Sequence, residues 1–236
     1  MPRRDLGGGL PLCRSTAQSI RSDFREKVSM KFTLMSYHYL RYPIRKYLDK
    51  MERVGLDGID IYCTGPQLNP FDYSLGALIQ LNRDIRDRHL TPYVLTAENC
   101  VYPVNLATSD LLTWESTQRY YQRLIDTAQF LECPHIQICP GTGYYDADKD
   151  EAWKRQVEAV QLLAEYAKKK GVTIFMETCK ITTTNLVVTS KELKQFIDDV
   201  GADNLLVFPT PTRCLRPGST STITLTIWAI SMALSI

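Results

Sequence analysis

This sequence of 236 residues lacks several features that identify disulfide-rich, zinc-binding, nucleic-acid-binding or membrane proteins. There is no Cys-x-x-Cys pair, and the seven cysteines are odd in number, which excludes a disulfide framework and a zinc knuckle and indicates free thiols in a reducing cytoplasm. The net charge is only +2, without a dense Lys/Arg stripe, so we expect no nucleic-acid partner. The uncharged run Ile223–Ile236 has 14 residues, fewer than the ~20 that span a bilayer, so we expect no membrane partner either.

Acidic residues are absent from the end of the chain. All 26 Asp and Glu residues precede Asn204, and Ser, Thr and Pro replace the helix expected after Phe208. We interpret residues 209–236 as a tail outside the domain pattern, such as a frameshifted or misjoined end.

The first residues of the chain also lie outside the pattern. Residues 1–29 carry five Arg and a Gly7–Gly9 run without an apolar period, and we predict a poorly ordered N-terminal extension there.

Between these ends, residues 30–208 repeat a short apolar strand followed by an amphipathic helix. The predicted strands are Lys31–Met35, Gly58–Tyr62, Tyr93–Leu95, His135–Cys139, Val172–Met176 and Asn204–Phe208. Helical spacings of three, four and seven fill the intervals. Because no Gly-x-Gly-x-x-Gly follows the first strand, a dinucleotide-binding fold is disfavoured. The pattern predicts one α/β domain, an incomplete (β/α)8 barrel with about six βα units.

Glu177 is the residue at which the fifth strand stops. Lys168–Gly171 has the composition of a helix end, and the uncharged run Val172–Met176 has that of a buried parallel strand. The carboxyl ends of parallel strands carry the chemistry of such folds, so Glu177 is a candidate site residue. The alternative is a carboxylate that faces solvent or pairs with a lysine.

Three segments make the chain resemble a known family. They are Glu98-Asn99-Cys100-Val101-Tyr102-Pro103, the turn Gly55-Leu56-Asp57-Gly58-Ile59-Asp60-Ile61-Tyr62, and Met176-Glu177 with Thr184-Asn185-Leu186-Val187-Val188. Over Met30–Leu206 the sequence resembles the sugar phosphate isomerase/epimerase family of xylose isomerase-like barrels, and within it the fructoselysine 3-epimerase-like proteins.

This resemblance implies an isomerase or epimerase whose substrate is a small sugar, a ketose phosphate or a fructosamine. Such enzymes move a proton through an enediolate, and a divalent metal ion (Mn, Co, Mg or Zn) holds the developing charge. The resemblance makes Glu177 both a metal ligand and a catalytic acid/base, and it places His38 and Glu98 in substrate binding. The alternatives are a solvent-facing His38 and a structural turn at Glu98.

The family's other metal ligands, an Asp, a His and a second Glu, have no match here, and Pro209 stands near the position of the Asp. The alternative function is therefore a truncated barrel fragment without catalysis of its own. The sequence leaves the substrate, the metal and a homo-oligomer open.

Overall fold

The computed structural model describes residues 33–56, 58–65, 67–98 and 104–208. All of them belong to the compact unit Phe32–Ile236. The extension predicted over residues 1–29 and the tail predicted over residues 209–236 lie outside the described residues, as do residues 99–103 of the loop after Glu98.

Strands and helices alternate along the described chain, as the periodicity predicts. The elements are β1 (Thr33–Met35), η1 (Ser36–Tyr39), α2 (Ile44–Val54), β2 (Gly58–Cys63), α3 (Leu75–Arg86), β3 (Pro92–Ala97), α4 (Leu111–Phe130), β4 (His135–Ile138), α5 (Lys149–Lys169), β5 (Thr173–Met176), α6 (Ser190–Val200) and β6 (Leu205–Val207). None of the helices in the described part of the chain is long and apolar enough to be a membrane span.

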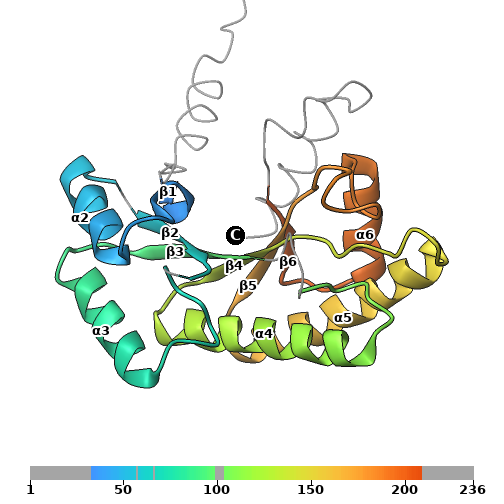
Figure 1. Ribbon diagram of the computed structural model, residues 1–236, viewed down its shortest axis with the longest axis horizontal. Helices are drawn as coiled ribbons and strands as arrows, with labels where there is room; N and C mark the ends of the chain where they lie inside the picture. Colours follow the sequence, from blue (N-terminus) through green and yellow to red (C-terminus); the bar gives the residue numbers. More distant parts are fainter. Residues whose placement is uncertain (1–32, 57, 66, 99–103, 209–236) are drawn as a thin grey trace, which may run out of the picture. The chain divides into compact units, whose positions relative to one another are not determined.

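The six strands form one sheet in the order of the chain, and every neighbouring pair is parallel (Figure 1). This topology follows from the sequence, because each strand is joined to the next by a helical crossover and parallel strands require such a connection. It confirms the predicted α/β class and a partial barrel, with six parallel strands in the described part of the chain. The carboxyl ends of all six strands therefore lie at the same edge of the sheet.

Local signals start and stop the helices that flank the strands of the site. Gly171 follows α5 with φ of 70°, a backbone conformation in which glycine carries no steric cost, and the chain turns there into β5. Thr189 and Glu192 form a capping box at the start of α6, where each side chain accepts a backbone N–H of the other residue. These ends fix where β5 begins and where the loop beyond it stops.

The two faces of the sheet differ in chemistry. Residues paired in register on one face, which we call the outer row, are Ile61, Leu95, Ile136, Ile174 and Leu205. They are at most 2% exposed and belong to one hydrophobic cluster with the apolar stripes of α2, α4, α5 and α6. The next residue of each strand faces the other way and makes up the inner row, which is Tyr62, Thr96, Gln137, Phe175 and Leu206.

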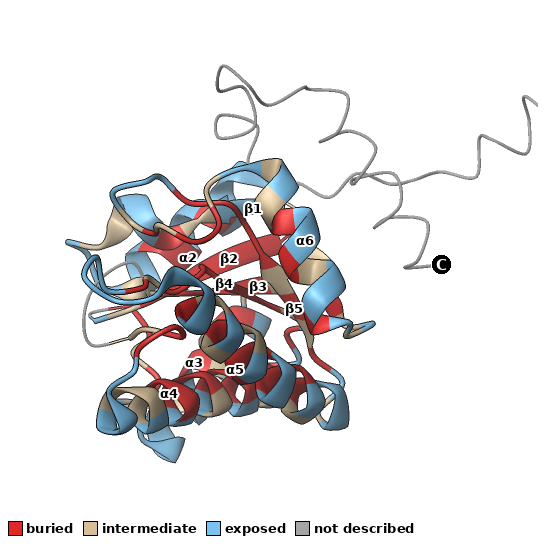
Figure 2. Ribbon diagram, turned by 90° about the vertical axis from the view of Figure 1, so that its right-hand side faces the viewer, coloured by how far each residue is buried: buried red, intermediate tan, exposed pale blue. Residues whose placement is uncertain are grey.

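Figure 2 shows the result, with buried residues on the strands and on the sheet-facing sides of the helices, and exposed residues on the outer helix surfaces. Each fully buried aliphatic side chain of the outer row contributes roughly 1.5–3 kcal/mol by leaving water. The outer row and its helices thus form the core, and the inner row is the surface that is free to carry chemistry.

Candidate functional site

Glu177 is the first residue after β5, and its carboxylate lies beside a thiol from the neighbouring strand. Ile138 of β4 pairs with Met176 of β5, so the next residue of each strand, Cys139 and Glu177, also lie side by side. The Cys139 Sγ is 3.7 Å from the Glu177 Oε1, and each residue is 6% exposed. The carboxylate that the sequence singles out is therefore buried and does not face solvent.

A second thiol approaches the same carboxylate from further along the chain. Cys179 is 3% exposed, and its backbone N–H donates to the carbonyl oxygen of Val187 at 3.2 Å, which holds the segment after Glu177 against the loop before α6. One ligand atom each from Cys139, Glu177 and Cys179 lies within 4.8 Å of the other two. Two thiols and a carboxylate at this spacing are a donor set for a divalent cation.

Further from the carboxyl ends of the strands, the inner face of the sheet carries a row of buried polar side chains from β2, β3 and β4, which we call the buried polar chain. Thr96 Oγ1 lies 2.8 Å from Asp60 Oδ1 and 3.3 Å from Gln137 Oε1, and all three residues are at most 5% exposed. Burial raises the pKa of Asp60 from its usual 3.8 to about 7; the hydrogen bond from Thr96 opposes this rise, and the negative charge of Glu177 adds to it. Asp60 can therefore hold a proton near neutral pH.

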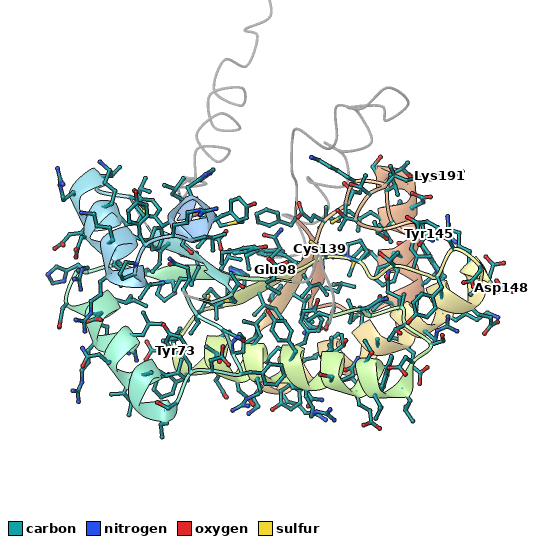
Figure 3. All side chains as sticks on the ribbon, in the orientation of Figure 1. Tyr73, Glu98, Cys139, Tyr145, Asp148 and Lys191 are labelled. Carbon is teal, nitrogen blue, oxygen red and sulfur yellow. The ribbon has the colours of Figure 1, made fainter. Side chains whose placement is uncertain are left out.

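Glu98 is the first residue after β3, and two tyrosine hydroxyls hold it in place. Its Oε2 accepts a hydrogen bond from the Tyr62 hydroxyl at 2.5 Å, and its backbone N–H donates to the Tyr120 hydroxyl at 3.2 Å. Figure 3 shows Glu98 and Cys139 near the middle of the sheet, consistent with the β3–β4 register. The carboxylate of Glu98 is half-buried at the same edge of the sheet as Glu177.

His38 lies at the same edge but at its margin. It belongs to η1, directly after β1, and is exposed. Its ring contacts Tyr37 edge-on at 5.9 Å between centroids, and Tyr37 contacts Tyr62 in the same way at 5.1 Å. Aromatic contacts thus link His38 to Tyr62, whose hydroxyl binds Glu98. The group of potential metal ligands within the described residues includes neither His38 nor Glu98.

The loop after β4 has glycines at positions 141 and 143 because it packs tightly between two other loops. A Cβ on Gly141 would lie 2.5 Å from the backbone nitrogen of Ala107, and one on Gly143 would lie 2.9 Å from the Ala152 Cβ. The side-chain amide of Asn105 makes two hydrogen bonds to the backbone of Thr142, and that of Asn185 makes two to the backbone of Gly143. Neighbouring protein atoms therefore account for both glycines.

Sequence reasoning missed the cysteines and the buried polar chain, although signals for both were present. Cys179 is two residues from Glu177, the spacing that places side chains on one side of an extended segment, and Cys139 is the last residue of the neighbouring predicted strand. Asp60 alternates with the apolar residues of β2 and so had to lie on the face opposite to them.

Comparisons with known proteins agree with this architecture. Residues 48–212 match the xylose isomerase-like TIM barrel family. No curated protein matches the chain. Among solved structures, a D-psicose 3-epimerase from Clostridium cellulolyticum H10 superposes with a TM-score of 0.74 at 20% identity, over 86% of this chain and 71% of that one.

Two further structures have the same fold. A 3-keto-D-glucoside 4-epimerase from E. coli has a TM-score of 0.71 at 10% identity, over 87% of this chain and 76% of the other. A xylose isomerase-like TIM barrel protein from Mycobacterium smegmatis, solved with magnesium, has a TM-score of 0.63 at 16% identity, over 78% of this chain and 62% of that chain. With the six parallel strands and the family match over more than half of its length, this chain belongs to the xylose isomerase-like TIM barrel family.

Proposed function

We propose that the chain is an isomerase or epimerase that moves a proton on a sugar, a ketose phosphate or a fructosamine, with Glu177 as the acid/base. The observation that carries this proposal is the buried carboxylate of Glu177 at the carboxyl end of β5, next to a polar inner face. Similarity in fold to a D-psicose 3-epimerase solved with D-tagatose supports the substrate class.

Glu177 has the surroundings of a proton-transfer group. A carboxylate that is 6% exposed lies largely out of bulk water, where its electrostatic interaction with a bound substrate is stronger than in water. Asp60 is coupled electrostatically to Glu177 and has a pKa of about 7, so it can remain neutral when Glu177 is charged. The pair of Asp60 and Glu177 then carries one negative charge instead of two.

Recognition of a sugar requires fixed polar groups, and the inner face supplies them. Glu98 is oriented by Tyr62 and can accept hydrogen bonds from substrate hydroxyls. Gln137 lies on the same face, where its amide is 3.3 Å from the hydroxyl of Thr96. His38 stands at the margin of this edge, where it can contact the far end of a longer substrate.

A divalent cation fits beside Glu177, since three ligand atoms lie within 4.8 Å of one another. When bound, such an ion stabilises negative charge that develops on substrate oxygens. Glu177 and the two thiols would hold it, and Glu98 would bind the part of the sugar away from the ion. We also propose that residues 30–208 form the barrel domain. Because the sequence has an odd number of cysteines, seven, and no Cys-x-x-Cys pair, we propose that the protein works in a reducing compartment such as the cytoplasm.

Exchange of solvent deuterium into a ketose tests the proposal. If Glu177 removes a proton and a deuteron from solvent returns on the same face, the carbon is labelled without being inverted, so exchange detects proton transfer even where epimerisation is not completed. The full chain, with Mn²⁺, Co²⁺ or Zn²⁺, is incubated with D-fructose or D-tagatose in D₂O and followed by NMR. We expect exchange, and a loss of about 10²-fold or more in Glu177→Gln.

Glu158→Gln is the matched control, because Glu158 lies exposed on α5, and it should exchange at the native rate. Exchange by Glu177→Gln at the native rate would remove Glu177 from the chemistry. No exchange by the native chain with any of these metals would favour the alternative function, a barrel fragment without catalysis.

A further inference from the structure

We infer that Cys139, Glu177 and Cys179 form a binding site for one thiophilic divalent cation, with Zn²⁺ as the biological candidate. The inference concerns binding alone, and it holds whether or not the chain moves protons on sugars. It differs from a site of oxygen and nitrogen ligands because two of the three donors are sulfur atoms.

Three parts of the backbone place these donors independently. The β4–β5 register brings Cys139 beside Glu177. Cys179 lies in the segment that a hydrogen bond to Val187 at 3.2 Å closes against the loop before α6. The hydroxyl of Thr184 in that loop donates to the carbonyl oxygen of Gly141, at 2.6 Å, and so ties the loop back to the segment that follows Cys139.

The spacing matches the geometry of tetrahedral zinc. With Zn–S bonds of about 2.3 Å and Zn–O bonds of about 2.1 Å, a tetrahedral ion holds its sulfur and oxygen ligands roughly 3.6 Å apart and two sulfurs roughly 3.8 Å apart. The Cys139 Sγ lies 3.7 Å from the Glu177 Oε1, and all three ligand atoms fall within 4.8 Å of one another. The limit of 4.8 Å exceeds the tetrahedral values by about 1 Å, so the donors need only small displacements to share one ion.

The chemistry of the donors selects the metal. Thiolates favour zinc, cobalt and cadmium, whereas magnesium and manganese prefer carboxylate, carbonyl and water oxygens. Binding of the ion releases protons. Each coordinating thiol loses its proton to solvent, and its sulfur donates an electron pair to the ion. Three protein ligands leave the fourth position of a tetrahedral zinc ion for water or a ligand oxygen, the arrangement of catalytic zinc sites.

Two other buried cysteines provide a contrast within the same chain. The thiol of Cys63 donates to the Ile61 carbonyl oxygen at 3.3 Å, and that of Cys133 donates to the His135 carbonyl oxygen at 3.4 Å. Neither belongs to the group of potential metal ligands found among the described residues. Buried thiols in this fold are thus ordinary core residues unless the backbone places them beside Glu177.

X-ray absorption spectroscopy on the native full chain, loaded with one equivalent of Zn²⁺ in a phosphine reductant, tests the site without any substitution. We expect two sulfur scatterers at about 2.3 Å with oxygen scatterers at about 2.0–2.2 Å. A first shell of oxygen and nitrogen alone, or failure of the native chain to retain zinc on gel filtration, would overturn the inference.

Variants then assign the ligands. We expect a thiolate-to-metal charge-transfer band with Co²⁺ that Zn²⁺ displaces, and at least a tenfold loss of zinc affinity in each of Cys139→Ser and Cys179→Ser. Cys63→Ser and Cys133→Ser are the matched controls and should keep native affinity, with circular dichroism confirming that every variant is folded. An unchanged band in the Cys139→Ser/Cys179→Ser double variant would contradict the assignment. No sugar is present in these measurements, so a failure here is distinct from a failure of the proposed reaction.

Discussion

The two faces of one sheet follow opposite rules, although neighbouring residues of the same strands build both. The outer row, for example Leu95 and Ile136, is aliphatic and essentially inaccessible to water. The inner row holds Thr96 and Gln137, and Asp60 lies on the same face with a raised pKa. Burial of polar groups costs free energy unless they are hydrogen-bonded, so polar residues of the inner face stabilise the fold less than the aliphatic residues of the outer row.

The comparison shows that consecutive residues of one strand have different roles, because one faces the apolar core and the next faces the candidate site. A residue that faces the helices contributes apolar burial, whereas the next residue faces the side on which Glu177 stands. Variants at neighbouring positions can therefore test the separation, since they leave the strand, its length and its hydrogen bonds unchanged. The expected effects below run from the largest to the smallest.

The pH dependence of stability should reveal Asp60. Its pKa is about 7 in the folded chain against the usual 3.8, so between about pH 4 and pH 7 the folded state holds a proton that the unfolded state has lost. Stability falls as pH rises through this window, by up to about 4 kcal/mol from this group. In Asp60→Asn we expect urea unfolding at a series of pH values to lack this fall.

Asp203→Asn is the control for this measurement. Lys168 holds the pKa of Asp203 below its usual value, so the effect of that group lies below the Asp60 window and the fall should persist. If Asp60→Asn had the native pH profile, Asp60 would not be the buried proton carrier of the inner face.

Truncation of the outer row should cost almost as much at every pH. Ile136 is 0% exposed, so Ile136→Ala removes a packed side chain and leaves a cavity, with an expected loss of about 3 kcal/mol in the free energy of unfolding. Chemical denaturation at neutral pH measures it. A loss below about 1 kcal/mol would mean that the helices do not pack tightly on this face.

Removal of the Thr96 hydroxyl should have the smallest effect of the three. Thr96→Val keeps the shape but deletes the hydrogen bond to Asp60, which costs about 1 kcal/mol. Because that hydrogen bond lowers the pKa of Asp60, its loss should extend the fall of stability to higher pH. A variant with native stability and an unchanged pH profile would show that Thr96 and Asp60 are not coupled.

The alternation of strands and helices was accessible to sequence reasoning because it rests on local patterns. Apolar runs and helical spacings predict each of the six strands, and Gly171 adopts the left-handed conformation that its place after a lysine run predicts. Details of packing were less accessible. Val54 and Leu75 fit the apolar spacing of α2 and α3, yet they are 52% and 64% exposed, because such a spacing does not show how far a neighbouring element extends.

The candidate site was only partly accessible for the same reason. Glu177 could be singled out because strand ends are visible in the sequence. The thiols of Cys139 and Cys179 could not be joined to it without the β4–β5 register and the closure of the next loop, which depend on contacts between distant residues. The roles of His38, Glu98 and Glu177 stay predictions, and the experiments above address that of Glu177.

The most direct test of the division between the two faces compares adjacent residues of β4. Ile136→Val shortens an outer-row side chain and should cost about 1 kcal/mol of stability, while Gln137→Leu removes a polar inner-row group at nearly constant size. Deuterium exchange into a ketose is measured for both variants and divided by the folded fraction. We predict at least a tenfold loss for Gln137→Leu and a rate within about twofold of native for Ile136→Val. Equal losses in the two variants, or a larger loss in Ile136→Val, would contradict the account.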